Sequence, residues 1–328
     1  LLLLYVMQKV NFTGTRLYQN TSTPSTTANL SYTTTTTQQY MPRNEAVSYV
    51  LGLINADRAK YGLSPVSLSS EPSAQQHAES MLQNNYFSHW DIYGMKPYMR
   101  YTLLGGKGAV DENIAYIYNS SGINVTKALA QMEYNFMYND FACCNDSHRK
   151  NILTPQHNQV SIGVAYNSTT IYLVEDFIND YISWQPGSPG INSAGQVSLN
   201  GATTAYNVSE VLISYEKPVM NLTRQQLMSS PYNFSYSYPE NIAGIGYSKG
   251  GVHYYYKGID TINATVYAQQ GNKFDIQFNI SQLIRQEGPG EYTVMVALSN
   301  STPNSTFIGS TYTFFIGANG LPFKPANV

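Results

Sequence analysis

The sequence predicts an α+β domain followed by an antiparallel β-sandwich. Two observations lead to this fold class. Between residues 43 and 185, apolar residues recur with helical spacing and then with strand spacing. After the turn-forming stretch Pro186–Gly190, short apolar segments recur about every ten residues, separated by turn residues. A length of 328 residues fits two domains. We therefore predict an N-terminal tail at 1–42, an α-β-α sandwich at 43–185, a linker at 186–190 and a β-sandwich at 191–328.

The first predicted domain contains three helices and a strand pair. The first helix follows Pro42 and ends at Gly62, and its apolar face is Val47, Val50, Leu51, Ile54 and Tyr61. The other two helices cover residues 73–84 and 125–138. Strands at residues 161–166 and 171–177 flank the turn-forming residues 167–169. Helices on both faces of one sheet would bury these apolar positions.

The second predicted domain contains almost only strands. They cover residues 208–215, 252–256, 263–268, 273–280, 292–298 and 310–316, and the last two form a hairpin-like closing pair. An immunoglobulin-like sandwich fits this pattern best, although the Cys–Trp–Cys markers of antibody domains are absent.

The first 40 residues form an apolar segment followed by a polar tract. Leu2, Leu4, Val6, Val10 and Phe12 alternate as in an extended strand. Residues 1–7 are too few to cross a bilayer, which takes about 20 residues, so no transmembrane helix is predicted here. The segment is either the end of a signal or anchor sequence, or a β-strand that needs a partner to bury it. The Thr/Ser/Asn-rich tract at residues 19–40 is typical of a linker or a glycosylated stalk.

The charge balance excludes two classes of partner. The chain has 18 Lys and Arg against 20 Asp and Glu, a net charge of −2 and no basic run. A protein that binds nucleic acid needs a clustered positive surface, and so does one that binds membranes electrostatically. Only 12% of the residues are charged, against about 25% in an ordinary globular protein. The sequence therefore favours an extracellular, cell-surface location over the cytoplasm.

Asn-X-Ser/Thr sequons are unusually frequent. They occur at Asn11, Asn20, Asn29, Asn119, Asn124, Asn145, Asn167, Asn207, Asn221, Asn233, Asn263, Asn279, Asn300 and Asn304. This density predicts a secreted glycoprotein with N-linked glycans, and we expect an archaeal cell-surface protein.

The two cysteines, Cys143 and Cys144, are adjacent in the sequence. Neighbouring Cα atoms lie only about 3.8 Å apart, so we expect a disulfide between them to be strained. The pair lacks the spacing of a zinc site. Reduced or vicinally oxidised thiols in a loop remain the two alternatives.

Four residues of the first domain could hold a divalent metal ion or perform acid–base chemistry. His89, Glu112, Glu133 and His148 come from different segments, and imidazole and carboxylate groups are the ligands that such a site uses. Scattered His and Glu are more often surface residues, so the residues alone give weak support.

Several strings around these residues resemble a known family. They are Ile54–Arg58, Tyr86–His89, Glu112–Ala115, His148–Leu153 and Ile162–Ala165, in that order. Residues 44–180 thereby resemble the prokaryotic branch of the CAP (SCP) superfamily. The resemblance implies an α-β-α sandwich whose cleft holds two His and two Glu, in some members with zinc. His89, Glu112 and His148 match three of these positions, and Glu133 is a looser match.

The chain departs from the family pattern near the last of these positions. Met132 stands where many bacterial relatives have Trp, and an insertion at residues 139–145 lengthens the loop before His148. The insertion could move His148 away from the other three residues.

Three further features are interpreted as structural. Gly246–Gly250 fits the G-x-S-x-G nucleophile motif, but a strand follows it where the motif needs a helix, so we predict a loop. Glu240–Ala243 repeats the Glu112–Ala115 string by coincidence. His77 is expected in packing or at the surface. No partner can be named for His157 or His253.

Three functions remain open. The preferred one is a non-catalytic subunit of an extracellular filament, in which the strand of Leu2 to Phe12 inserts into another copy of the chain. The alternatives are a binder of metal, lipid or glycan in the cleft, or a metal-assisted hydrolase. The resemblance implies mostly non-catalytic binders, and none of the matched strings contains a nucleophile.

Overall fold

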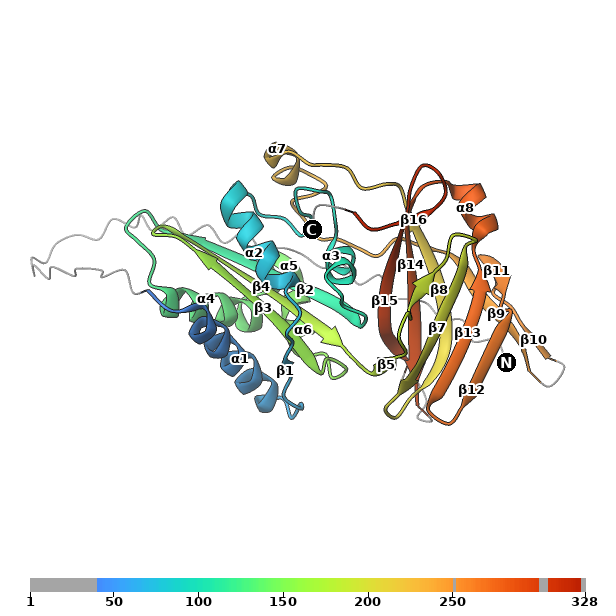
Figure 1. The fold of residues 1–328 in the computed structure, drawn as a ribbon. Coiled ribbons are helices and arrows are strands. Elements are labelled where there is room, and N and C mark those ends of the chain that lie inside the picture. Colours follow the sequence, from blue (N-terminus) through green and yellow to red (C-terminus); the bar gives the residue numbers. More distant parts are fainter. Residues whose placement is uncertain (1–39, 250–251, 301–305, 326–328) are drawn as a thin grey trace, which may run out of the picture.

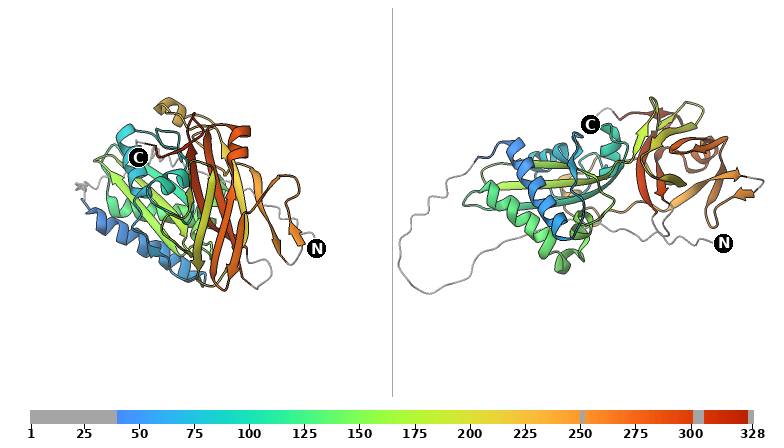
Figure 2. Two further views of the ribbon diagram at one scale, coloured as in Figure 1. Left: turned by 45° about the vertical axis from the view of Figure 1, so that its right-hand side comes forward. Right: turned by 90° about the horizontal axis from the view of Figure 1, so that it is seen from below.

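The computed structural model describes residues 40–249, 252–300 and 306–325, which form two halves packed against each other (Figures 1 and 2). The predicted N-terminal strand, the Thr-rich tract and the sequons at Asn11, Asn20, Asn29 and Asn304 lie outside the described residues. None of the described helices is long and apolar enough to cross a membrane.

The first half is one four-stranded sheet with helices on both faces. Its strands are β1 (Ser67–Leu68), β2 (Ala109–Tyr118), β3 (Gln159–Tyr166) and β4 (Thr170–Asn179), in the order β1-β3-β4-β2. Its helices are α1 (Arg43–Lys60), α2 (Ser73–Asn84), α3 (Pro97–Leu103), α4 (Val125–Tyr138), α5 (Phe141–Cys144) and α6 (Ser147–Ile152). β2 is an edge strand that pairs only with β4 among the described strands.

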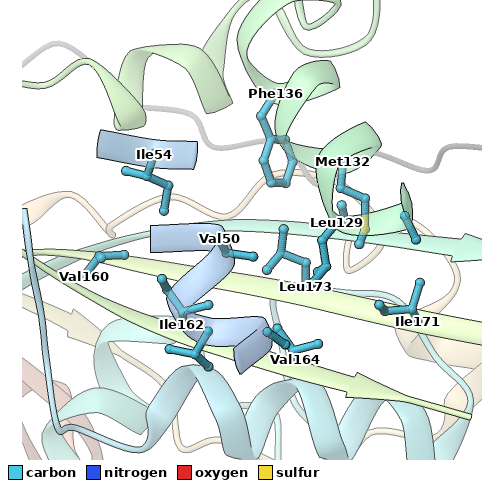
Figure 3. Close-up of a cluster of buried hydrophobic side chains, with 14 of the residues drawn as sticks. Val50, Ile54, Leu129, Met132, Phe136, Val160, Ile162, Val164, Ile171 and Leu173 are labelled. Atoms are coloured by element: carbon cyan, nitrogen blue, oxygen red, sulfur yellow. The ribbon is translucent and has the colours of Figure 1, made fainter. Parts of the chain in front are cut away.

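Strand alternation gives this sheet two apolar faces. On one face, side chains of β3 and β4 pack against α1 and α4, as Figure 3 shows. Val50 and Ile54 of α1 and Leu129 of α4 are completely buried there. On the other face, Val174 of β4 packs with Ala78 of α2. The α-β-α arrangement of this half follows from these two cores.

Local sequence signals set the helix ends. The Oδ1 atom of Asn124 accepts a hydrogen bond from the Lys127 amide (3.0 Å) and caps α4. Helix α2 ends at Asn85, whose φ of 51° is left-handed. The predicted ranges 73–84 and 125–138 are confirmed. Tyr61 does not belong to the buried face of the first helix: it follows the last helical residue and is 45% exposed.

The second half contains two sheets that share one apolar core. The larger sheet contains β8 (Asn207–Glu216), β9 (Asn241–Lys249), β10 (Val252–Tyr254), β11 (Asp260–Asn263), β14 (Gly290–Ser299), β15 (Phe307–Ile316) and β16 (Pro322–Phe323). The smaller sheet contains β5 (Ile182–Trp184), β6 (Gly190–Ile191), β7 (Gln196–Thr203), β12 (Val266–Gln270) and β13 (Lys273–Asn279). Short helices α7 (Arg224–Leu227) and α8 (Ser281–Glu287) lie in connections. Every pairing except β9 with β11 is antiparallel.

Three expectations for this half need correction. The predicted strand at 263–268 is divided between β11 and β12, which belong to different sheets. Residues 246–249, predicted as a loop, belong to strand β9, because Gly246 pairs with β11 and residues 247–249 pair with β10. The smaller sheet also begins at β5, ahead of the predicted linker at 186–190.

The two halves meet along β15 and the start of β2. The Thr311 amide donates to the carbonyl of Gly108 (3.1 Å), and the Ser310 hydroxyl donates to the carbonyl of Lys107 (2.7 Å). The side-chain amide of Asn179 donates to the carbonyl of Ile308 (2.8 Å). These direct bonds join the sandwich to the edge of the first sheet.

Candidate functional site

His89 and Glu112 form a buried pair on the α2/α3 side of the sheet. His89 lies in the loop after α2, Glu112 lies on β2, and both have an exposed fraction of 0%. The Nδ1 atom of His89 lies 2.7 Å from Oε1 of Glu112. Arg100 of α3 donates to the other oxygen, Oε2, at 2.6 Å and to the carbonyl of His89 at 2.7 Å. All three side chains are thus held by internal partners.

A second carboxyl lies next to this pair. Asp176 of β4 is the register partner of Glu112, and the Ser73 hydroxyl donates to its Oδ2 atom at 2.5 Å. Burial raises the pKa of Glu112 to about 7, although the Arg100 charge opposes this effect. The pKa of Asp176 is raised well above its usual range by burial and by the nearby Glu112. Burial lowers the pKa of His89, as do the charges of His148 and Arg100.

His148 and Glu133 lie on the opposite, α1/α4 side of the sheet. The ring of His148 stacks on Phe136 of α4, with 4.6 Å between ring centroids. Its Nδ1 atom lies 2.5 Å from Oδ1 of Asp140, and its amide donates to Oδ2 of Asp140 at 2.8 Å. Glu133 interacts with Glu175 of β4, and burial and the Glu175 charge raise its pKa well above the usual range.

Of the four predicted site residues, His89 and Glu112 therefore contact each other on one side of the edge strand β2, and Glu133 interacts with Glu175 on the other side. His148 lies close enough to His89 for its charge to lower the His89 pKa. Glu112 pairs in register with Asp176, whereas Asn113 pairs with Glu175 and donates to its carboxylate at 3.2 Å. Because strand side chains alternate, these neighbours point to opposite faces. Among the described residues, no three of the four supply ligand atoms that all lie within 4.8 Å of one another. This arrangement does not fit a four-ligand zinc centre.

Three other residues do meet this 4.8 Å criterion. Ligand atoms of Asp140, Cys143 and Cys144 lie within 4.8 Å of one another. The two cysteines are joined in a vicinal disulfide within the short helix α5, so of the two alternatives left by the sequence the structure has the oxidised one. Both sulfur atoms are engaged in this bond.

The remaining histidines have structural partners where the structure describes them. Nε2 of the buried His77 lies 2.8 Å from the carbonyl of Ser88. His157, for which the sequence suggests no partner, lies 2.8 Å from Oδ1 of Asn179 and stacks on Phe177. His253 is on the edge strand β10. The string Glu240–Ala243 lies at the start of β9, where Asn241 and Ala243 pair with β8. It is far from His89 and Glu112 in the sequence.

None of the described sequon asparagines is buried. Seven are exposed and three are half-buried. The exposed ones are Asn119, Asn145, Asn167, Asn207, Asn221, Asn263 and Asn300, and the half-buried ones are Asn124, Asn233 and Asn279.

The sequence does not predict the residues that hold these side chains in place. Arg100 and Asp140 lie in segments for which no element was predicted at all. Glu175 and Asp176 carried a usable signal, because two adjacent carboxylates interrupt the apolar run Tyr172–Ile178. Tyr236, whose ring centroid lies 4.9 Å from that of His89, comes from the second half.

Comparison with known proteins supports a CAP domain in the first half. Residues 51–178 match the model of the CAP, or cysteine-rich secretory protein, family. No curated protein matches the chain. The mixed helix and sheet content of this region agrees with the family match.

Three solved structures are similar over less than half of this chain. An extracellular SCP-domain protein from Bacillus anthracis is 21% identical with a TM-score of 0.33, over 44% of this chain and 45% of that one. An outer surface protein from Borrelia burgdorferi is 12% identical with a TM-score of 0.31, over 43% and 99%. The CAP domain of the enterococcal protein PrgA is 14% identical with a TM-score of 0.29, over 43% and 64%. The chain thus spans less than half of the Bacillus anthracis structure.

Proposed function

We propose that the chain is a secreted, N-glycosylated cell-surface protein whose CAP domain has a structural rather than a catalytic role. The observation that carries this proposal is the state of the His89 pair. Both side chains are fully buried, and the Glu112 carboxylate and Nδ1 of His89 bond internal groups, so solvent and substrate have no access to the pair. A hydrolase or a cleft binder would need this pair open on at least one side.

Glycosylation is supported by the position of the sequons. An oligosaccharide cannot be buried, and none of the ten described sequon asparagines is buried. Asn119, Asn124 and Asn167 gather at one end of the first half, because the Asn119 amide bonds the carbonyl of Thr169 and the Ile123 amide bonds that of Ser168. Sugars there would shield the end that faces away from the sandwich.

We expect the protein secreted by its own host to be heavier than the 36.5 kDa of its sequence. The measurement is intact mass before and after chemical deglycosylation, followed by peptide mapping. Exposed sites such as Asn167 and Asn263 are expected to carry sugar. A secreted protein with the unmodified mass would contradict this part of the proposal.

The finer proposal is a filament built by strand insertion. The alternating segment Leu2–Phe12 would add to an open sheet edge of another copy, and repeated head-to-tail insertion generates a fibre. Among the described strands, β12 pairs only with β13 and leaves its other edge free. An unpaired edge of this length is the feature that β-augmentation uses.

Replacing both Leu4 and Val6 by aspartate is expected to abolish filaments, because a charged residue cannot be buried in an apolar contact between copies without a large desolvation cost. Negative-stain electron microscopy and sedimentation give the readout. Thr35→Asp in the polar tract is the matched control and should leave assembly unchanged. Filaments formed by the double variant would refute strand insertion.

A further inference from the structure

Residues 217–240, called the strap below, connect two strands that are direct neighbours. β8 ends at Glu216, β9 begins at Asn241, and the two strands pair in antiparallel fashion. A hairpin loop of about two to five residues would be enough for this connection. The strap instead leaves the sandwich and crosses the α2/α3 side of the first half, where α7 lies beside α2 (Figure 1).

Apolar residues of the strap complete the core of the first half. Leu222 and Leu227 are buried in the same cluster as Ala78 and Met81 of α2. The Leu222 amide donates to the carbonyl of Ile92 at 2.8 Å. Further along, the Ser88 hydroxyl donates to the carbonyl of Tyr232 at 2.6 Å, one residue before His89. The strap therefore approaches the His89 pair along a continuous line of contacts.

The strap ends with two tyrosines at the edge of β2. The hydroxyl of Tyr236 accepts a hydrogen bond from the Glu112 amide at 3.2 Å, and its ring centroid lies 4.9 Å from that of His89. The hydroxyl of Tyr238 donates to the carbonyl of Val110 at 2.9 Å, and its ring stacks on Tyr98. The Val110 carbonyl and the Glu112 amide point away from β4, along the open edge of β2. The hydroxyls of Tyr238 and Tyr236 bond these two groups, which a neighbouring strand would otherwise bond.

We infer that the first half contains a phenol-binding pocket, formed by His89, Tyr98 and the Glu112 backbone. Tyr236 of the same chain occupies this pocket. The pocket encloses its occupant, since Tyr236 is only 1% exposed. The ring is tilted by 60° to the imidazole at 4.9 Å between centroids, and the hydroxyl has a fixed donor in the Glu112 amide. A para-substituted phenol fits this pocket, because its aromatic ring packs against the pocket walls and its hydroxyl accepts the hydrogen bond of the Glu112 amide. This goes beyond the proposed function, because it holds whether or not filaments form.

The test removes the occupant and supplies a substitute. Tyr236→Ala is expected to lower the melting temperature by about 10 °C, because it leaves a ring-sized cavity. Millimolar p-cresol should then raise it by several degrees, whereas toluene, which lacks the hydroxyl, should raise it clearly less. Tyr232→Ala, on the same strap but half-buried against Trp90, is the matched control and should gain nothing from p-cresol.

A second variant decides the question if Tyr236→Ala fails to fold. Tyr236→Phe keeps the ring and removes only the hydroxyl, so amide exchange at Glu112 is expected to be at least about tenfold faster, with Ile114 on the same strand unchanged. Selective p-cresol rescue, or faster exchange at Glu112 alone, supports the pocket. Equal effects of p-cresol on wild type and variant, or unchanged exchange at Glu112, overturn it.

Discussion

Arg58→Ala is expected to lower the free energy of unfolding by about 4 kcal/mol or more. Arg58 lies on α1 and is completely buried. Its guanidinium donates to four backbone carbonyls: Ser64 at 2.8 Å, Ile152 at 2.7 Å, Thr154 at 3.0 Å and His157 at 3.1 Å. Truncation leaves these carbonyls without their donor and opens a cavity beneath α1.

The measurement is thermal and urea denaturation, with an expected fall in melting temperature of about 10 °C. Arg58→Lys should recover only part of the loss, since one ammonium group cannot span four carbonyls as the guanidinium fork does. Arg43→Ala, on the exposed face of the same helix, is the matched control and should change stability by less than about 0.5 kcal/mol. A change below about 1 kcal/mol for Arg58→Ala would show that these hydrogen bonds contribute little.

The second large expected effect is a decrease in the free energy of unfolding as the pH rises. Buried carboxyls with raised pKa values are spread over both halves of the molecule. Burial raises the pKa of Glu112, Glu175 and Glu291 to about 7, and that of Glu133 and Asp176 well above the usual range. In the unfolded chain these groups ionise near pH 4. Between about pH 4.5 and 7 the folded state therefore holds protons that the unfolded state has lost, and stability falls as pH increases.

Three buried histidines act in the opposite direction. Burial lowers the pKa of His77 and His89 well below the usual range and that of His157 to about 3. The folded protein keeps these imidazoles neutral. They therefore do not oppose folding above about pH 6.5, and they lower the stability as the pH falls toward their folded pKa values. Carboxyls outnumber these imidazoles, so the net slope follows the carboxyls above pH 4.5, and the maximum stability is expected near pH 4–5.

A series of melting curves between pH 3 and 8 checks this expectation. Stability should fall by about 3–5 kcal/mol between pH 5 and 7, which corresponds to one or two net protons. Glu133→Gln, which cannot ionise, should flatten the slope and raise stability at pH 8. Glu45→Gln, on the exposed face of α1, should leave the profile unchanged. A stability maximum above pH 7 would show that these carboxyls are ionised in the folded protein.

The sequence predicts three helices and several long strands because their signals are local, but it misses the long strands β2, β7 and β9. Apolar spacing and the residues Pro42, Asn85 and Asn124 mark α1, α2 and α4 to within a residue or two. The repeated apolar segments likewise predict the closing pair β14 and β15, which is confirmed. These elements need no knowledge of what packs against them.

The candidate site is only partly predictable, because its geometry depends on distant segments. Positions of His89, Glu112 and His148 follow from motifs, but the sheet face on which each side chain lies depends on the register of β2 with β4. Arg100 and Asp140 look like ordinary surface residues in the sequence. The role of Tyr236 could not be foreseen, since nothing local distinguishes it among 29 tyrosines.

The strap also fixes the order in which the protein can finish folding during synthesis. Phe87 of the first half and Met228 of the strap bond each other across 141 positions of sequence. During synthesis the N-terminal residues emerge first. The α2 side of the first half therefore stays uncovered until the strap has been synthesised. Contacts over such separations also form slowly. Synthesis of the strap, rather than of residues 43–185 alone, is the event that closes the first half's core.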